Sequence, residues 1–142
     1  TQAVDFANDC LWGTLSCTVL IDSQTQSQYR SALDSAIANL RYGAIGINLW
    51  SAMLFYLGST TWGAYPGNPL TDIGSGIGFV HNSYLFDRPQ KSVVYAPFRI
   101  FPTPVWFATH KHLLGIAKHL LKFEAYPTWQ NLPAVIMAAL RG

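Results

Sequence analysis

The chain has 142 residues, of which 50% are hydrophobic, 14% aromatic and only 11% charged, with a formal net charge of +2. This length suits one domain, but the charged fraction is well below the roughly 25% of ordinary soluble domains. Two cysteines exclude a disulfide framework, and we expect a cytoplasmic protein. The shortage of charge indicates a surface that is covered by a partner or by the rest of a larger polypeptide.

The charges are divided unevenly along the chain. Residues 1–87 hold six acids and two bases, whereas residues 88–142 hold seven bases and one acid, giving −4 and +6. A basic part can meet phosphate, acidic lipid or an acidic neighbour. The bases form no compact run, so we do not expect nucleic acid as a partner.

The N-terminal third predicts a βαβ unit. The first residues, TQAVDFANDC, lack the regions of a secretory signal and resemble the middle of a helix. Residues 14–21 and 44–48 suit buried strands, and residues 24–41 suit an amphipathic helix between them. Asp22 and Ser23 can cap this helix, and Gly43 is expected at its left-handed end. The predicted inward stripe of this helix is Tyr29, Leu33, Ile37 and Leu40. Strands joined in this way should lie parallel.

The remaining elements are less regular. Residues 49–57 fit a strand, a helix or a buried loop equally well, and residues 58–78 read as a long loop rich in glycine and proline. Residues 79–86 and 91–95 suit two strands of a hairpin, and residues around 97–105 should be extended.

Two helices are expected near the C-terminus, at residues 108–123 and 131–140. In the second, Leu132, Val135, Ile136 and Ala139 should point inward. The predicted organisation is therefore a single α/β domain or fragment, with a βαβ portion (1–57), a loop and hairpin (58–95) and a C-terminal helical extension (96–142).

No Asp, Glu, Lys or Arg occurs between Arg41 and Asp72. A membrane helix would need about 20 consecutive apolar residues, and the strongest part of this stretch, Leu49 to Leu57, has nine, followed by Gly58 and prolines. A buried segment is the better interpretation of the stretch.

Glycines and histidines form two weak motifs. The spacing of GSGIG (residues 74–78) differs from that of a dinucleotide-binding loop, so a turn that needs positive φ is favoured. His110, His112 and His119 lack acidic or cysteine ligands at suitable spacing, and solvated or capping histidines are favoured over a metal site.

Neither cysteine is a good candidate nucleophile. Cys17 lies within an apolar strand, where burial raises the pKa of a thiol, and Cys10 follows Asp9, which disfavours a thiolate. We therefore assign no catalytic residue.

The predicted helix at 108–123 places Leu113, Ile116, Leu120 and Phe123 on one side and lysines on the other. Such a helix can lie on an acidic membrane surface, but it more often covers a sheet and exposes its lysines to water. We expect the second arrangement, and no membrane partner.

Aromatic residues crowd the charge-free stretch. Core packing explains many such clusters, but an apolar funnel for a small ligand also uses this composition beside glycine and proline. The members are Trp50, Phe55, Tyr56, Trp62 and Tyr65.

Three blocks of the sequence resemble the aldehyde dehydrogenase superfamily. The first, AVDFANDCLWGTLSCTVLID, is similar to the family's ANDxxYGLxxxV stretch. Ala7, Asn8, Asp9 and Gly13 match it, and Trp12 takes the place of the usual aromatic residue.

The other two blocks follow in the family's order. YGAIGIN is similar to AGxVxVN, with Gly43 and Asn48 matching, and STTWGAYPGNPLTDIGSGIG resembles a degraded PFGGxKxSGxG without its lysine. In this third block Trp62, Gly63 and Gly67 stand in for the family's residues. The resemblance covers nearly the whole chain but only the last quarter or so of such an enzyme.

The resemblance implies a C-terminal part of an aldehyde-dehydrogenase-like catalytic domain, contributing to an oxidoreductase that uses NAD or NADP and a small aldehyde. The nucleophile, its glutamate and the nucleotide-binding domain would lie on preceding polypeptide, so this chain would hold no cofactor and be inactive alone. Its partners would be the rest of the parent polypeptide or further copies in a homo-oligomer.

Asn48, Trp50, Phe55 and Trp62 are the residues expected to line the substrate entrance. The alternative is a small binding or membrane-associating module that uses an aromatic pocket and the basic helix.

Overall fold

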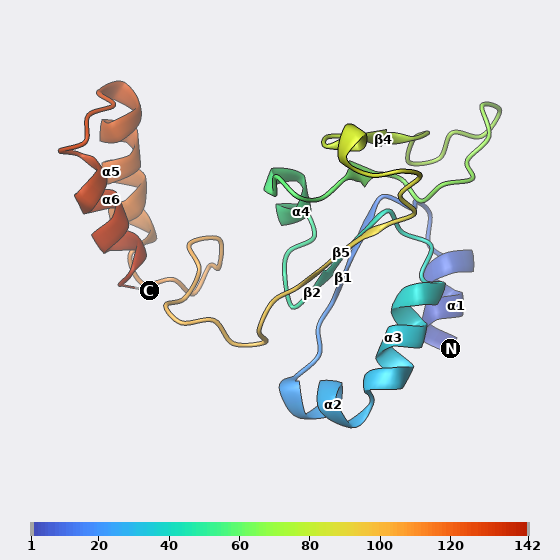
Figure 1. Cartoon of the computed structure of the whole chain (residues 1–142). Helices are drawn as coiled ribbons and strands as arrows, with labels where there is room; N and C mark the ends of the chain where they lie inside the picture. Colours follow the sequence, from blue (N-terminus) through green and yellow to red (C-terminus); the bar gives the residue numbers. More distant parts are fainter. Residues whose placement is uncertain (1, 142) are drawn as a thin grey trace. The chain divides into compact units, whose positions relative to one another are not determined.

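The computed structural model describes residues 2–141, and the chain divides after Phe98 into two compact units. The first unit contains α1 (Gln2–Asp9), β1 (Ser16–Val19), α2 (Ser23–Gln28), α3 (Arg30–Asn39), β2 (Ala44–Ile47), α4 (Met53–Tyr56), β3 (Trp62–Gly63), β4 (Phe79–Val80), η1 (Ser83–Leu85) and β5 (Ser92–Tyr95) (Figure 1). The second unit contains α5 (Leu113–Ala125) and α6 (Leu132–Ala139).

A three-stranded parallel sheet organises the first unit. The strand order is β1-β2-β5, and all four residues of the central strand β2 are buried. Ser16 lies opposite Ala44, and Ala44 lies opposite Ser92. The α/β class and the parallel βαβ unit predicted from the sequence are therefore confirmed.

The predicted hairpin of residues 79–86 and 91–95 is wrong. The Phe79–Val80 strand instead pairs antiparallel with Trp62–Gly63, while β5 joins the main sheet beside β2. The Ser92 N–H donates to Gly43 O at 2.8 Å, and the Ala96 N–H donates to Ile47 O at 2.9 Å. These bonds complete the backbone pairing of β2, which a local hairpin would leave open on one side.

The core lies between the sheet and the helices on one of its faces. Ile45 and Ile47 point from β2 toward Leu33 and Ile37 of α3. These four side chains are buried together with Leu40 and Tyr42, and side chains of α1 pack against their rim. The inward stripe was thus predicted correctly for Leu33, Ile37 and Leu40.

The predicted helix of residues 24–41 is broken in two. Asp22 caps α2 as expected, since its Oδ1 accepts from the N–H groups of Gln24 and Thr25. Tyr29 then leaves helical geometry at φ −116° and ψ 30°, and its side chain is exposed rather than inward. Tyr29 therefore separates α2, which buries no residue, from α3, which buries Leu33 and Ile37.

Gly43 does not end the helix, contrary to the sequence expectation. Helix α3 ends at Asn39, and Leu40 follows it in extended geometry. Residue 43 must be glycine because there is no room for a side chain. A Cβ there would lie 1.9 Å from Gly63 O and 2.8 Å from the carbonyl carbon of Ala64. The backbone of the Gly63 strand therefore passes directly over the start of β2.

In the second unit, α5 and α6 pack against each other (Figure 1). Helix α5 begins at Leu113, five residues later than predicted, because residues 104–112 form turns stabilised by His110. The buried His110 ring accepts the His112 N–H through Nδ1, so its Nε2–H donates to Ala139 O at 3.1 Å. His110 is a capping histidine, as the sequence indicated.

The inward face of α6 is only partly as predicted. Ala138 is its buried residue, and Leu132, Val135 and Ala139 are half-buried, but Ile136 is exposed. The helix has no charged residue, so its sequence alone could not show which apolar side would meet α5.

Substituting Gly43 with alanine tests the close approach over β2. Because the added Cβ meets backbone atoms that cannot rotate away, Gly43→Ala should lower the free energy of unfolding by about 3 kcal/mol or more in urea denaturation. Gly58→Ala is the matched control, since nothing lies within 4 Å of the position that a Cβ would take there, and it should change stability by less than about 1 kcal/mol. Equal effects at both positions would contradict the predicted clash.

Candidate functional site

The four residues predicted to line a substrate entrance are only partly brought together. Phe55 and Trp62 make an edge-to-face contact, with ring centroids 5.8 Å apart. Trp50 is 57% exposed and does not join this ring contact, and Asn48 is buried in a backbone contact. Of the four residues, Phe55 and Trp62 are therefore the pair whose rings the fold brings into contact.

Four side chains form what we call the aromatic cluster: Phe55, Tyr56, Trp62 and His81. The His81 ring stacks on Phe55 with centroids 5.2 Å apart and an interplanar angle of 26°. Phe55 remains 44% exposed, so the cluster is partly open to solvent. Such a surface can hold an apolar or planar group against its rings.

His81 was missed from the sequence because its position depends on an unusual loop. His81 and Asn82 both have left-handed backbone geometry, with φ of 64° and 56°. The Asn82 side-chain amide donates to Thr60 O at 2.8 Å and to Leu57 O at 3.2 Å. This amide joins the His81 loop to the chain after α4, and the pair of positive φ angles then turns His81 onto Phe55. Consecutive His and Asn after an apolar strand are the only sequence signal, because Asn tolerates this geometry.

Uncharged hydroxyl groups cover the sheet face next to α4. Ser51 Oγ lies 3.1 Å from Ser16 Oγ, and Thr61 Oγ1 lies 3.0 Å from Ser92 Oγ. The Thr18 hydroxyl donates to Leu49 O. The charge-free stretch thus satisfies its polar groups against β1 and β5 without any ionised side chain.

Lys91 directly precedes β5 and carries a positive charge. Its Nζ donates to Ile37 O, Ala38 O and Leu40 O at 3.0, 2.8 and 2.6 Å, and lies 5.2 Å from the centroid of the Tyr65 ring. Partial burial lowers the pKa of this amine. Because Lys91 is committed to the carbonyl end of α3, it stabilises the fold and does not point at the aromatic cluster.

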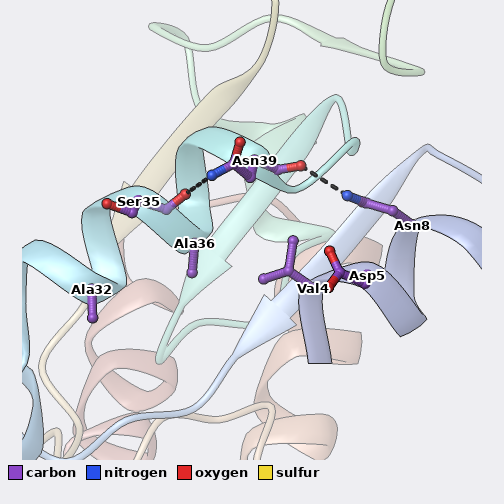
Figure 2. A pocket seen from close by; sticks show the side chains of 7 residues that line it. All are labelled: Val4, Asp5, Asn8, Ala32, Ser35, Ala36 and Asn39. Atoms are coloured by element: carbon purple, nitrogen blue, oxygen red, sulfur yellow. Dashed lines mark hydrogen bonds between the residues drawn. The ribbon is translucent and has the colours of Figure 1, made fainter. Parts of the chain in front are cut away.

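The residues of the motif Ala7-Asn8-Asp9 join α1 to the end of α3. Figure 2 shows Asn8 donating from Nδ2 to Asn39 O at 2.8 Å. Its Oδ1 accepts the Arg41 N–H at 2.8 Å, and the Asp9 carboxylate pairs with the Arg41 guanidinium. The shallow cavity beside these contacts, about 450 Å³, is lined by both helices. Asn8 and Asp9 are structural residues here.

Asn48 is also structural. It has φ 58°, and its side chain accepts the Ile21 N–H at 2.8 Å and donates to Ile21 O at 2.9 Å. The side-chain amide of Asn48 therefore bonds to the backbone of Ile21 just beyond the last paired residues of β1 and β2, Val19 and Ile47. Both of its polar atoms are used, so little of Asn48 is left to bind a substrate.

A second cavity, about 400 Å³, lies between α1, α3 and β1. Its lining has no charged residue and includes the Cys17 thiol beside Leu33 and Ile37. Burial raises the pKa of Cys17 to about 11, as expected from the sequence. Cys17 is therefore a protonated, weakly reactive thiol near neutral pH.

The glycine-rich segment is a series of turns between β3 and β4. Gly74, Gly76 and Gly78 have φ of 54°, 127° and 76°, in agreement with the predicted need for positive φ. The strand β4 follows them directly, in place of an α-helix whose N-terminus could present amides to a phosphate, so these residues do not fit a dinucleotide.

Within residues 2–141, no three or more His, Cys, Asp or Glu side chains are grouped to hold a metal ion. Among the helices in this range, none combines the length and apolar character needed to cross a bilayer. Comparison of the chain with protein-family models, curated proteins and solved structures finds no match.

The suppressed thiol of Cys17 is directly measurable. Near pH 8, a pKa of about 11 in place of 9.0 lowers the thiolate fraction roughly 100-fold, so Cys17 should react with a disulfide reagent about 100-fold more slowly in the native chain than after unfolding in guanidinium. The Cys10→Ser variant isolates this reaction, and Cys17→Ser serves as its control. A native Cys17 that reacts as fast as the unfolded thiol would contradict the assigned burial effect.

Proposed function

We propose that this chain forms the C-terminal part of an NAD(P)-dependent aldehyde-dehydrogenase-like oxidoreductase. It supplies part of the substrate-entrance wall and contacts between subunits, and it is inactive by itself. The nucleophile and the nucleotide-binding domain belong to preceding polypeptide in the cytoplasmic parent protein. The three sequence blocks that resemble this superfamily support the proposal, together with the features below.

The open edges of the parallel sheet carry the proposal. In β1, Leu15 O and Val19 O accept bonds from Ala44 and Asn48, so the backbone groups of Ser16 and Thr18 point away from β2. In β5, the groups of Val93 and Tyr95 point outward by the same alternation. Within the described part of the chain, each of these strands pairs only with β2.

Unpaired edges of this kind are expected where strands of another polypeptide segment extend the sheet. An unpaired strand edge invites pairing, and natural proteins protect such edges with charge, bulges or a covering element. Residues 14–21, which contain β1, have no charged side chain, and the uncharged 400 Å³ cavity lies beside that strand. A strand added at β1 could place an apolar side chain in this cavity.

The aromatic cluster fits the wall of an aldehyde entrance. The Asn82 amide holds the His81 loop to Thr60 O, and the other three rings belong to the charge-free stretch, which brings no ionised side chain to them. Hydride transfer from a thiol adduct benefits from the exclusion of bulk water. In this proposal Phe55 and Trp62 contact the substrate, whereas Asn48 holds β1 and β2 together.

No catalytic step is assigned to residues of this chain. The thiol of Cys17 is kept protonated by burial, and the glycine-rich turns do not fit a dinucleotide. NAD or NADP would be held by the nucleotide-binding domain of the parent protein, and oxidation of the aldehyde would take place where that domain meets the entrance wall.

An activity assay tests the assignment of chemistry to other polypeptide. The purified 142-residue chain, mixed with NAD or NADP and a set of aliphatic and aromatic aldehydes, should form no reduced nicotinamide above the rate without protein. Turnover typical of an enzyme, roughly 1 per second or faster, would contradict this assignment.

The gene provides the matching positive test. The reading frame upstream of the Thr1 codon should encode a nucleotide-binding domain followed by a reactive cysteine. An unrelated upstream frame, with no such domain, would overturn the proposed function.

A further inference from the structure

The helix pair α5–α6 exposes apolar side chains that the core of its own unit does not use. None of the 13 residues of α5 is buried, although it packs against α6. Leu114 and Leu121 are 70% and 71% exposed. With Ala117 they occupy positions i, i+3 and i+7, which form one stripe along the helix.

Helix α6 adds a second apolar surface. Its sequence, LPAVIMAA, has no charged residue, and Ala138 is the residue that it buries. Ile136 and Met137 are exposed, as is Leu140 just after the helix. The two helices therefore expose apolar side chains at positions that their mutual contact leaves uncovered.

Positive charge borders this apolar surface. Leu114, Lys118 and Lys122 are spaced four residues apart. The two lysines therefore lie along the side of the helix next to the leucine stripe. The unit that starts at Arg99 has five bases and one acid, which gives a net charge of +4 with neutral histidines. Glu124 is its one acidic residue.

The connection between the helices carries aromatic residues typical of a bilayer interface. Tyr126 and Trp129 are strongly exposed, and Trp129 reaches 87%. Tyrosine and tryptophan are enriched where a protein meets the headgroup layer, because one end of each ring system is apolar and the other can hydrogen-bond.

We infer that the α5–α6 pair attaches the protein to the surface of an anionic lipid bilayer. The helices lie in the interface, with Leu114 and Leu121 among the acyl chains and Lys118 and Lys122 directed to the headgroups. A protein partner fits less well, because lysine is depleted from protein–protein interfaces. This inference departs from the sequence-based expectation that the basic helix is an ordinary covering helix, because Leu114 and Leu121 are exposed beside the lysines.

This inference is independent of the proposed oxidoreductase role. Membrane attachment would hold for the α5–α6 pair whether or not the first unit belongs to an aldehyde-oxidising enzyme. Conversely, absence of vesicle binding would leave the sheet edges and the aromatic cluster unaffected.

Vesicle flotation of the full 142-residue chain tests the attachment. The chain should float with vesicles of phosphatidylcholine containing about 30% phosphatidylglycerol, bind pure phosphatidylcholine at least tenfold more weakly, and be released by high salt. Equal binding to both lipids, or no binding to the anionic vesicles at low salt, would overturn the inference.

Charge variants identify the lysines. Lys118→Gln combined with Lys122→Gln should lower the partition coefficient about 30-fold, because each basic residue near an anionic surface contributes about fivefold. Arg30→Gln with Arg88→Gln removes the same charge from exposed positions of the first unit and should change binding less than about threefold. Similar losses in both pairs would indicate attraction by net charge alone and contradict the assigned surface.

Leucine variants identify the apolar stripe. Leu114→Ser with Leu121→Ser should weaken binding roughly tenfold or more, whereas Leu20→Ser with Leu70→Ser should not, although those leucines are 74% and 85% exposed. All four side chains are exposed, so both variants should fold, which circular dichroism checks. If Leu114→Ser with Leu121→Ser instead dissociates an oligomer and leaves vesicle binding intact, the stripe is a protein interface and the inference fails.

Tryptophan quenching gives a readout of depth. Brominated lipids should quench Trp129 on binding, so the quenching should be reduced by Trp129→Phe but not by Trp12→Phe, which removes an equally exposed ring (88%) from the first unit. Quenching that depends on Trp12 rather than Trp129 would place the contact on the other unit and refute the inference.

Discussion

The structure of the first unit depends on how closely two segments approach the central strand β2. A Cβ on Gly46 would lie 2.5 Å from Leu49 O, and one on Gly43 would lie 1.9 Å from Gly63 O. The chain after β2 can therefore fold back over the sheet, and the β3 segment can cross the start of the strand. This double covering buries β2 without charge and fixes the segment that carries Phe55 and Trp62.

Local patterns were sufficient to predict the βαβ unit but not its neighbours. Leu33 and Ile37 recur at helical spacing and are buried, and Asp22 caps the helix that follows it. The position of β5 depends on bonds to Gly43 and Ile47, more than 40 residues earlier, which no local pattern encodes. The hairpin prediction is wrong because it pairs strands that are close in sequence, whereas β5 pairs with a strand far from it in sequence.

In the candidate site, too, some residues can be predicted from local sequence, whereas others depend on contacts between distant parts of the chain. The aromatic composition singles out Phe55 and Trp62, and the fold brings their rings into contact. Asn48 looked equally suitable, but its amide is committed to Ile21, and this contact depends on the register of β1 and β2. His81 joins the rings through a loop with positive φ angles, so its role could be found only from the fold.

Amide hydrogen exchange of the isolated chain tests the proposal that β1 and β5 are sheet edges that other polypeptide completes. Amides that point away from the sheet, such as those of Ser16 and Thr18, should exchange far faster than amides of β2, such as that of Ala44, which donates to Leu15 O. Outward amides of β1 that are protected as strongly as those of β2, at a concentration where the chain is monomeric, would show that the edge is already covered and would contradict the account.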